Sequence, residues 1–85
     1  MSEKTEKKRL SIGEERVRIS FNPSGSGDVY SIKSEAAISI NRCENAKPLS
    51  PSSFDDREVL RLLALAQTAY EEAAMWAVKA LTYNI

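Results

Sequence analysis

The last third of the chain contains a long helical pattern that lacks a broad polar face. No charged residue lies between Arg61 and Glu71, and most of the residues between them are leucine and alanine. An ordinary surface helix of a small protein buries one apolar stripe and shows water a broad polar face. Because this pattern carries apolar side chains on more than one side, a single packing partner leaves part of it uncovered. We therefore expect copies of the same chain to associate.

Length and composition also favour self-association. The chain has 85 residues, enough for one small domain, and such domains usually need a disulfide, a metal or oligomerisation for stability. Cys43 is the only cysteine and histidine is absent, which excludes an intrachain disulfide and argues against a metal site. We expect no cofactor. The charged N-terminus and the interruption of the apolar run at Glu71 and Glu72 predict no signal peptide or membrane partner, and a protein of a reducing cytoplasm.

The charge balance restricts the class of ligand. Twelve basic and twelve acidic residues give a net charge of zero. Proteins that bind polymeric nucleic acid usually carry a net basic surface, because neutralisation of phosphates drives that binding. We therefore expect no polymeric nucleic acid as a partner. A small anionic ligand remains compatible with the composition, because a few cations in a local pocket are sufficient to hold it.

The order of residue types predicts a charged leader over residues 1–15, followed by a single domain over residues 16–85. The leader has little to bury and is expected to be mobile or to form a short helix on the body. The segment from Arg16 to Phe21 alternates polar and apolar side chains, which predicts an extended arm. Pro23, Gly25 and Gly27 then predict an irregular turn.

Two helices are predicted after the turn, so the fold class is all-α. Asp28 is the expected N-cap of the first, which continues to about Asn45. Its apolar face consists of Val29, Ile32, Ala36, Ile40 and Cys43. The second helix is expected from about Phe54 to Tyr83, a length of about 45 Å, with Ser53 and Asp56 resembling a capping box. A short connection between two long helices predicts an antiparallel helical hairpin.

No set of catalytic residues is recognisable. Histidine, the usual general base, is absent. Cys43 falls on the apolar face of the first predicted helix, where a buried thiol is the expected role. Glu71 and Glu72 point roughly 100° apart on a helix and cannot act as a facing carboxylate pair. We expect a protein that is not an enzyme.

Two groups of residues are candidates for binding an anion. The turn that begins at Phe21 offers backbone N–H groups and serine hydroxyls to a phosphate, and the ring could stack on a base. The alternative is a common Gly-Ser loop whose phenylalanine fills the hairpin core. Lys33, one helical turn further on, either reaches a phosphate held at the turn or is solvated.

Arg57 and Arg61 form the second group, because they are four residues apart and share a helix face. Neighbouring acidic residues suggest surface ion pairs, whereas copies arranged around a symmetry axis would create a ring of positive charge. Met75 and Trp76 are expected to be core or interface anchors.

The residues resemble those of a known family. The first stretch is Val17-Arg18-Ile19-Ser20-Phe21-Asn22-Pro23-Ser24-Gly25, and the second is Asp56-Arg57-Glu58 leading to Tyr70-Glu71-Glu72-Ala73-Ala74-Met75-Trp76-Ala77-Val78-Lys79-Ala80. Together they resemble the phage anti-CBASS cyclic-nucleotide sponges and the hairpin domain of the related anti-Thoeris cyclic ADP-ribose sponge. The likeness covers about residues 16–82. Anti-Thoeris relatives typically carry extra sequence before the hairpin, so this short chain is expected to be of the anti-CBASS type.

The resemblance implies a phage counter-defence protein that forms a homohexamer in the cytoplasm of the infected bacterial host. Such a protein sequesters cyclic dinucleotides and cyclic trinucleotides without cleaving them, and so blocks activation of CBASS effectors. The residues that it implies for the dinucleotide pocket are Phe21, Asn22, Pro23, Ser24 and Lys33. It implies Arg57 for a separate trinucleotide site, to which we add Arg61. The alternatives are a sponge for cyclic ADP-ribose isomers, a purely structural oligomer, and a nucleic-acid-binding regulator that uses the basic residues of the leader.

Overall fold

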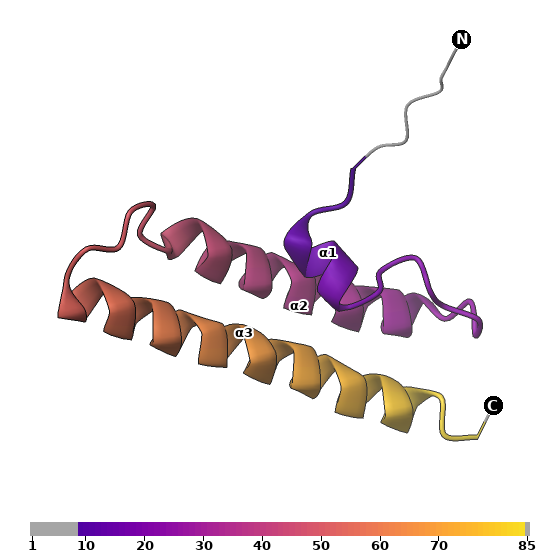
Figure 1. Ribbon diagram of the computed structural model, residues 1–85. Coiled ribbons are helices and arrows are strands. Elements are labelled where there is room, and N and C mark those ends of the chain that lie inside the picture. Colours follow the sequence, from indigo (N-terminus) through magenta and orange to yellow (C-terminus); the bar gives the residue numbers. More distant parts are fainter. Residues whose placement is uncertain (1–8, 85) are drawn as a thin grey trace, which may run out of the picture.

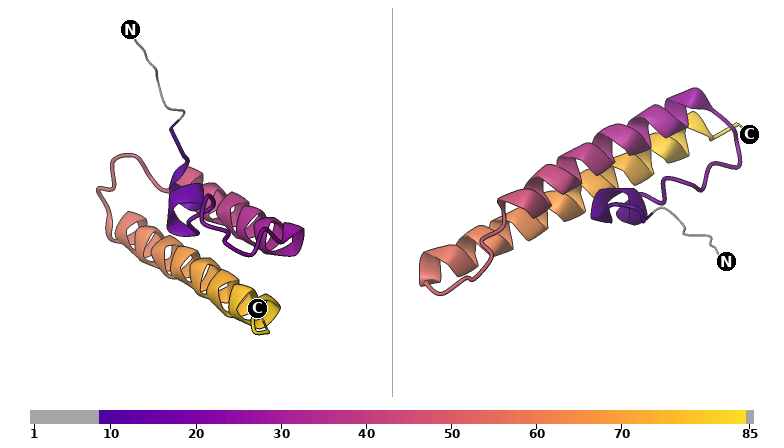
Figure 2. Two further views of the ribbon diagram at one scale, coloured as in Figure 1. Left: turned by 90° about the vertical axis from the view of Figure 1, so that its right-hand side faces the viewer. Right: turned by 90° about the horizontal axis from the view of Figure 1, so that it is seen from above.

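The computed structural model describes residues 9–84. Three helices are present in this range, and it contains no strand: α1 (Ile12–Arg16), α2 (Gly27–Ala46) and α3 (Phe54–Leu81). The helices α2 and α3 run antiparallel, side by side, and the short α1 packs against α2 near the middle of the hairpin (Figures 1 and 2). The prediction of an all-α helical hairpin is confirmed.

The start of α2 lies two residues before the predicted one. Ser26 is the N-cap, in place of Asp28, and its Oγ atom accepts a hydrogen bond of 3.3 Å from the backbone N–H of Val29. Asp28 instead lies in the first turn, where its carboxylate faces the positive end of the helix dipole. The helix ends at Ala46, because Lys47 precedes a proline and adopts an extended conformation (φ −68°, ψ 137°).

The start of α3 is as predicted. Ser53 is the N-cap, and its hydroxyl accepts a hydrogen bond of 3.0 Å from the backbone N–H of Asp56. In a capping box the N3 side chain also accepts a bond from the N–H of the N-cap. Here the Asp56 carboxylate accepts it from Ser52, one residue before the N-cap, at 3.2 Å. The helix ends at Leu81, before the predicted Tyr83, where the Thr82 hydroxyl donates a hydrogen bond of 2.8 Å to the carbonyl of Val78.

The predicted extended arm from Arg16 to Phe21 is wrong. α1 ends at Arg16, and the chain then turns, with the N–H of Ile19 donating to the Glu14 carbonyl and the N–H of Phe21 to the Arg18 carbonyl, both at 2.9 Å. The backbone groups of this segment pair within the turn, and residues 9–84 contain no strand with which an extended segment could pair. The alternating pattern has another cause, since Val17 and Ile19 pack on the core beneath the turn.

The apolar core of the hairpin is small. Its buried apolar residues are Val17, Val29, Ala37, Ile40 and Ala74. Three residues of the predicted apolar face of α2 are only half-buried, namely Ile32, Ala36 and Cys43. The buried face is rotated toward Lys33 and Ala37, because α2 packs against α1 as well as α3.

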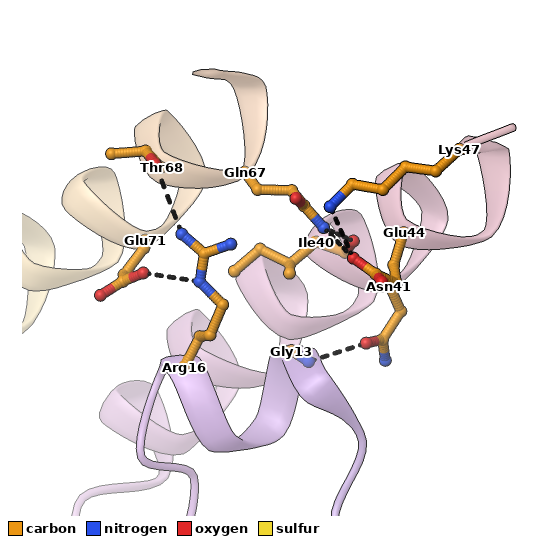
Figure 3. Close-up of polar contacts among 9 residues, drawn as sticks. All are labelled: Gly13, Arg16, Ile40, Asn41, Glu44, Lys47, Gln67, Thr68 and Glu71. Atoms are coloured by element: carbon orange, nitrogen blue, oxygen red, sulfur yellow. Dashed lines mark hydrogen bonds and ion pairs between the residues drawn. The ribbon is translucent and has the colours of Figure 1, made fainter. Parts of the chain in front are cut away.

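A glutamine occupies the centre of the interface between α2 and α3. Gln67 is 1% exposed, and its Nε2 atom donates hydrogen bonds to the carbonyl of Ile40 at 3.1 Å and to the Glu44 carboxylate at 3.0 Å (Figure 3). These bonds satisfy a polar group that would otherwise be costly to bury. The bond from Gln67, together with the nearby Lys47, lowers the pKa of the Glu44 carboxyl group.

The outer side of α3 remains uncovered in the single chain. Its exposed large apolar residues include Leu62, Leu65, Tyr70, Met75 and Trp76, the last with 58% of its surface accessible. Met75 and Trp76 are therefore not part of the core of the chain. Within residues 9–84, no helix has the length and hydropathy needed to span a lipid bilayer.

Candidate functional site

The turn that precedes α2 is held by hydrogen bonds among its own residues. The Ser24 hydroxyl donates to Asn22 Oδ1 at 2.7 Å and accepts from the N–H of Ser26 at 3.1 Å. The amide of Asn22 closes the turn by donating to the carbonyl of Ser26 at 2.9 Å. Gly25 has a φ of 69°, a left-handed conformation that glycine adopts without steric cost. The polar side chains of the turn therefore fix its shape.

Lys33 lies beneath this turn and is only 7% exposed. Its Nζ atom donates hydrogen bonds to the backbone carbonyls of Arg18, at 2.9 Å, and of Phe21. Burial, followed by the charge of Arg18, lowers the pKa of Lys33. An ammonium group has three donors, so one N–H remains after these two bonds. The predicted alternative of a solvated lysine is wrong.

Phe21 projects outward from the turn. Its side chain is 55% exposed, so in the single chain it does not fill the hairpin core. The guanidinium carbon of Arg18 lies 4.8 Å from the ring centroid, and Lys33 Nζ lies 5.6 Å from it. An aromatic face next to two cations suits a ligand that combines a base with a phosphate.

A cavity of about 270 Å³, which we call the loop pocket, brings together all five residues that the resemblance implies for cyclic dinucleotides. Its lining consists of Phe21, Asn22, Pro23, Ser24, Val29, Lys33, Val78 and Thr82. The last two come from the C-terminal end of α3 and were not predicted from the sequence. They reach the turn because the antiparallel arrangement returns the end of α3 to the start of α2 (Figure 1).

A larger groove of about 470 Å³ adjoins the loop pocket and shares Phe21, Lys33 and Val78 with it. We call it the arginine groove, because Arg16 and Arg18 line it together with Lys79. Glu71 is the one carboxylate in its lining, and its Oε1 atom forms an ion pair of 2.8 Å with Arg16. The combined surface is therefore positive and partly apolar.

Arg57 and Arg61 lie elsewhere, in the first turns of α3 at the opposite end of the hairpin (Figure 1). Both are exposed. Arg61 forms a two-pronged ion pair with Glu58, with distances of 3.1 Å from Nε and 2.6 Å from Nη2. This is the surface ion pair that the acidic neighbours suggested. Neither arginine lines the loop pocket, so the two predicted sites are separate in space.

Sequence reasoning missed the residues that attach α1 to the hairpin. They are Gly13, Arg16, Asn41 and Glu71. A usable signal was present in Ser11 and Glu14, which form a complete capping box at the start of α1. The spacing of serine and glutamate three residues apart is typical of a helix start.

The site contains groups suited to binding a ligand. No group of three histidine, cysteine, aspartate or glutamate residues able to hold a metal occurs in the part of the chain that the structure describes. The surface of the site consists of an aromatic ring, a buried ammonium group and a rigid polar turn. Such a surface can hold a ligand by stacking and charge.

Comparison with known proteins identifies a family. The model of the Acb2/Tad1 hairpin domain family matches residues 12–82, a range that includes all three helices, the loop pocket and both arginines of α3. No curated protein and no solved structure matches the chain. Because the family match extends over most of its length, the chain belongs to the Acb2/Tad1 hairpin domain family.

Proposed function

We propose that the protein binds cyclic oligonucleotide immune messengers and sequesters them without cleavage. Membership of the Acb2/Tad1 hairpin domain family suggests a cyclic-nucleotide sponge. In this chain the sponge would act as a phage counter-defence protein in the cytoplasm of the infected bacterial host. By holding cyclic dinucleotides and cyclic trinucleotides, it would keep them from CBASS effectors.

The observation that carries the proposal is the loop pocket. Phe21 offers an exposed ring for base stacking, worth about 1–3 kcal/mol per base in stacking sites. Lys33 lines the same pocket and brings a positive charge to it, with one donor beyond those that hold the turn. The cations of the arginine groove add to the positive potential next to it. A cyclic dinucleotide combines the two features that this surface recognises, bases and phosphates.

The size of the loop pocket supports assembly as part of the function. Small-molecule sites usually have volumes of about 300–1,000 Å³ and enclose most of the ligand. The loop pocket, at about 270 Å³, is smaller and partly open to solvent. A neighbouring protomer would supply the missing wall, and the apolar outer side of α3, including Leu65 and Trp76, would supply the contact surface. We propose a homohexamer, the assembly that the family resemblance implies.

A second site for cyclic trinucleotides would lie at the start of α3. Arg57 is exposed there and would converge with its copies around a symmetry axis to form a ring of positive charge. Arg61 would join this ring by exchanging its ion pair with Glu58 for ligand phosphates. Surface ion pairs of this kind contribute about 0–1 kcal/mol, so the exchange costs little.

The test is to titrate the purified oligomer with a panel of cyclic nucleotides by calorimetry, and to pass the complexes through gel filtration. The panel contains cyclic GMP–AMP, cyclic di-GMP, cyclic tri-AMP and a cyclic ADP-ribose isomer. We expect the dinucleotides and the trinucleotide to remain bound and to be released intact on heating. A nanomolar Kd corresponds to about −12 kcal/mol, which is compatible with stoichiometric capture.

Each other outcome identifies an alternative. Cleaved nucleotides would indicate an enzyme, and binding of the cyclic ADP-ribose isomer alone would indicate an anti-Thoeris-type sponge. An oligomer that binds none of the panel would be structural. Retention of duplex DNA that disappears at high salt would indicate a nucleic-acid-binding regulator.

A further inference from the structure

One side chain of α2, Asn41, forms hydrogen bonds with the short helix α1. The Oδ1 atom of Asn41 accepts a hydrogen bond of 2.8 Å from the backbone N–H of Gly13 (Figure 3). Its Nδ2 atom donates a hydrogen bond of 3.0 Å to the hydroxyl of Ser11, the N-cap of α1. One amide therefore holds the first turn of α1 by both of its polar atoms.

The contact between the two helices is close enough to require glycine. A Cβ atom added at Gly13 would lie 2.2 Å from the backbone carbonyl oxygen of Ala37 and 2.8 Å from Asn41 Oδ1. Real Cβ atoms do not approach backbone atoms so closely, so any side chain at this position would displace α1. The position of α1 on α2 is therefore determined by backbone contact at Gly13 as well as by the hydrogen bonds of Asn41.

The other end of α1 is attached to α3. Arg16 Nε donates to Glu71 Oε1 at 2.8 Å, and its Nη2 atom lies 3.4 Å from the Thr68 hydroxyl (Figure 3). This five-residue helix thus bridges both helices of the hairpin. The bridge restrains α1 at two points, one on each partner.

Hydrogen bonds connect α1 to the loop pocket. The N–H groups of Arg18 and Ile19 donate back to the carbonyls of Glu15 and Glu14, at 3.1 Å and 2.9 Å. The carbonyl of Arg18 in turn accepts a hydrogen bond from Lys33, which lines the loop pocket. A continuous series of hydrogen bonds therefore connects Asn41 to the ring-bearing end of the turn.

We propose that Asn41 is a positioning residue for the loop pocket: it touches no ligand, but by fixing α1 it sets the location of Phe21 and therefore the affinity for a cyclic dinucleotide. This inference rests on the proposed function of the pocket. Because Arg57 lies at the opposite end of the hairpin, binding of a trinucleotide there should not depend on Asn41.

The test compares three variants of the full chain by calorimetry with cyclic GMP–AMP. Asn41→Ala removes both bonds and should raise the Kd about tenfold, the effect expected for one to two lost hydrogen bonds. Asn41→Asp keeps an acceptor for the Gly13 N–H, and the Ser11 hydroxyl can donate to the carboxylate, so we expect affinity within about twofold of wild type. Asn45→Ala removes an exposed amide from the same helix and should leave the Kd unchanged.

Two further measurements separate positioning from general destabilisation. In Asn41→Ala, amide hydrogen exchange should accelerate over residues 12–24 but stay unchanged in the central turns of α3, and the affinity for cyclic tri-AMP should be retained. Equal losses for both ligands, faster exchange throughout α3, or wild-type affinity in Asn41→Ala would each overturn the inference. If the wild type binds no cyclic nucleotide, the proposed function fails. Hydrogen exchange over residues 17–24 would then still decide whether Asn41 fixes the turn.

Discussion

The ammonium group of Lys33 lies 2.9 Å from the backbone carbonyl oxygen of Arg18, fifteen residues earlier in the chain. The same group donates to the carbonyl of Phe21. One buried lysine thus stabilises the turn and lines the loop pocket. Charge-assisted hydrogen bonds contribute about 1.5–3 kcal/mol each, so this lysine is a major determinant of the conformation of the turn.

Replacing Lys33 by methionine should therefore reduce binding of cyclic dinucleotides strongly. The Lys33→Met substitution keeps an unbranched apolar stem but removes the ammonium group that holds the turn and faces the pocket. We expect the Kd for cyclic GMP–AMP, measured by calorimetry, to rise at least about tenfold. Arg42→Met, which removes an exposed cation from the same helix, is the control and should bind as wild type. Unchanged affinity in Lys33→Met would argue against the pocket.

The two proposed sites should respond to different substitutions. Phe21→Ala removes the exposed ring and should weaken cyclic GMP–AMP binding by about 1–3 kcal/mol, while leaving cyclic tri-AMP binding nearly intact. Arg57→Ala should do the reverse. Titrations of both variants with both ligands measure this. Loss of both ligands in either variant would contradict the assignment of separate sites.

Self-association should depend on the outer side of α3. Leu65 is 56% exposed in the single chain, and a charge at this position would be buried unpaired in an interface between copies. We expect Leu65→Lys to lower the molecular mass measured by light scattering, with helical content retained in circular dichroism. Ser50→Lys, in the exposed connection between α2 and α3, should keep the wild-type mass. A wild-type chain that is monomeric in dilute buffer would refute the assembly itself.

The buried amide of Gln67 provides a prediction on pH. The bond from Gln67 lowers the pKa of Glu44, so this carboxylate stabilises the fold above its ordinary pKa of 4.5, and the contribution is lost as the pH falls through its lower folded value. Since the Glu44 side chain is 39% exposed, solvent screening keeps the contribution of this carboxylate to the free energy of unfolding below about 1 kcal/mol. Gln67→Glu would place a second carboxylate beside Glu44. Burial next to a like charge would raise the pKa of the new carboxyl group.

The midpoint of thermal unfolding of Gln67→Glu should therefore lie well below that of the wild type at pH 7. The difference should shrink as the pH falls from the raised folded pKa toward the ordinary value of 4.5, because protonation of one carboxylate removes the repulsion. Thermal scans at several pH values and a fixed protein concentration measure this. Gln67→Met, which removes the amide without adding a charge, should show no such recovery in acid. A pH-independent deficit in Gln67→Glu would contradict the contact with Glu44.

Two glycines should respond oppositely to alanine. Gly13→Ala should destabilise the protein by more than about 1 kcal/mol, because the added Cβ atom would overlap the carbonyl of Ala37. Nothing lies within 4 Å of a Cβ atom at Gly27, the first residue of α2, so Gly27→Ala should stabilise by about 0.4–1 kcal/mol. Chemical denaturation at fixed concentration measures both. Equal effects would show that α1 does not rest on Ala37.

The two long helices, α2 and α3, were predictable from the sequence because their signals are local. Ser53 precedes a long apolar pattern at the correct spacing, and Pro48 accounts for the end of α2 one or two residues before it. The arm was not predictable from periodicity. The alternation around Val17 satisfies the pattern of a strand equally well, and only the packing of Val17 and Ile19 on the core identifies it as a turn.

The sequence by itself determined the class of the protein: the cap and spacing signals define two helices, the uncharged run of α3 leaves an apolar side uncovered, and the family motifs place Phe21 and Arg57 in separate segments. Only the tertiary structure decided how these parts meet. In the folded chain Lys33 is buried beneath the turn, and Val78 and Thr82 line the loop pocket. Asn41 holds α1 in place on α2. Such contacts join residues distant in sequence, and their geometry depends on how the helices pack, which no local pattern specifies.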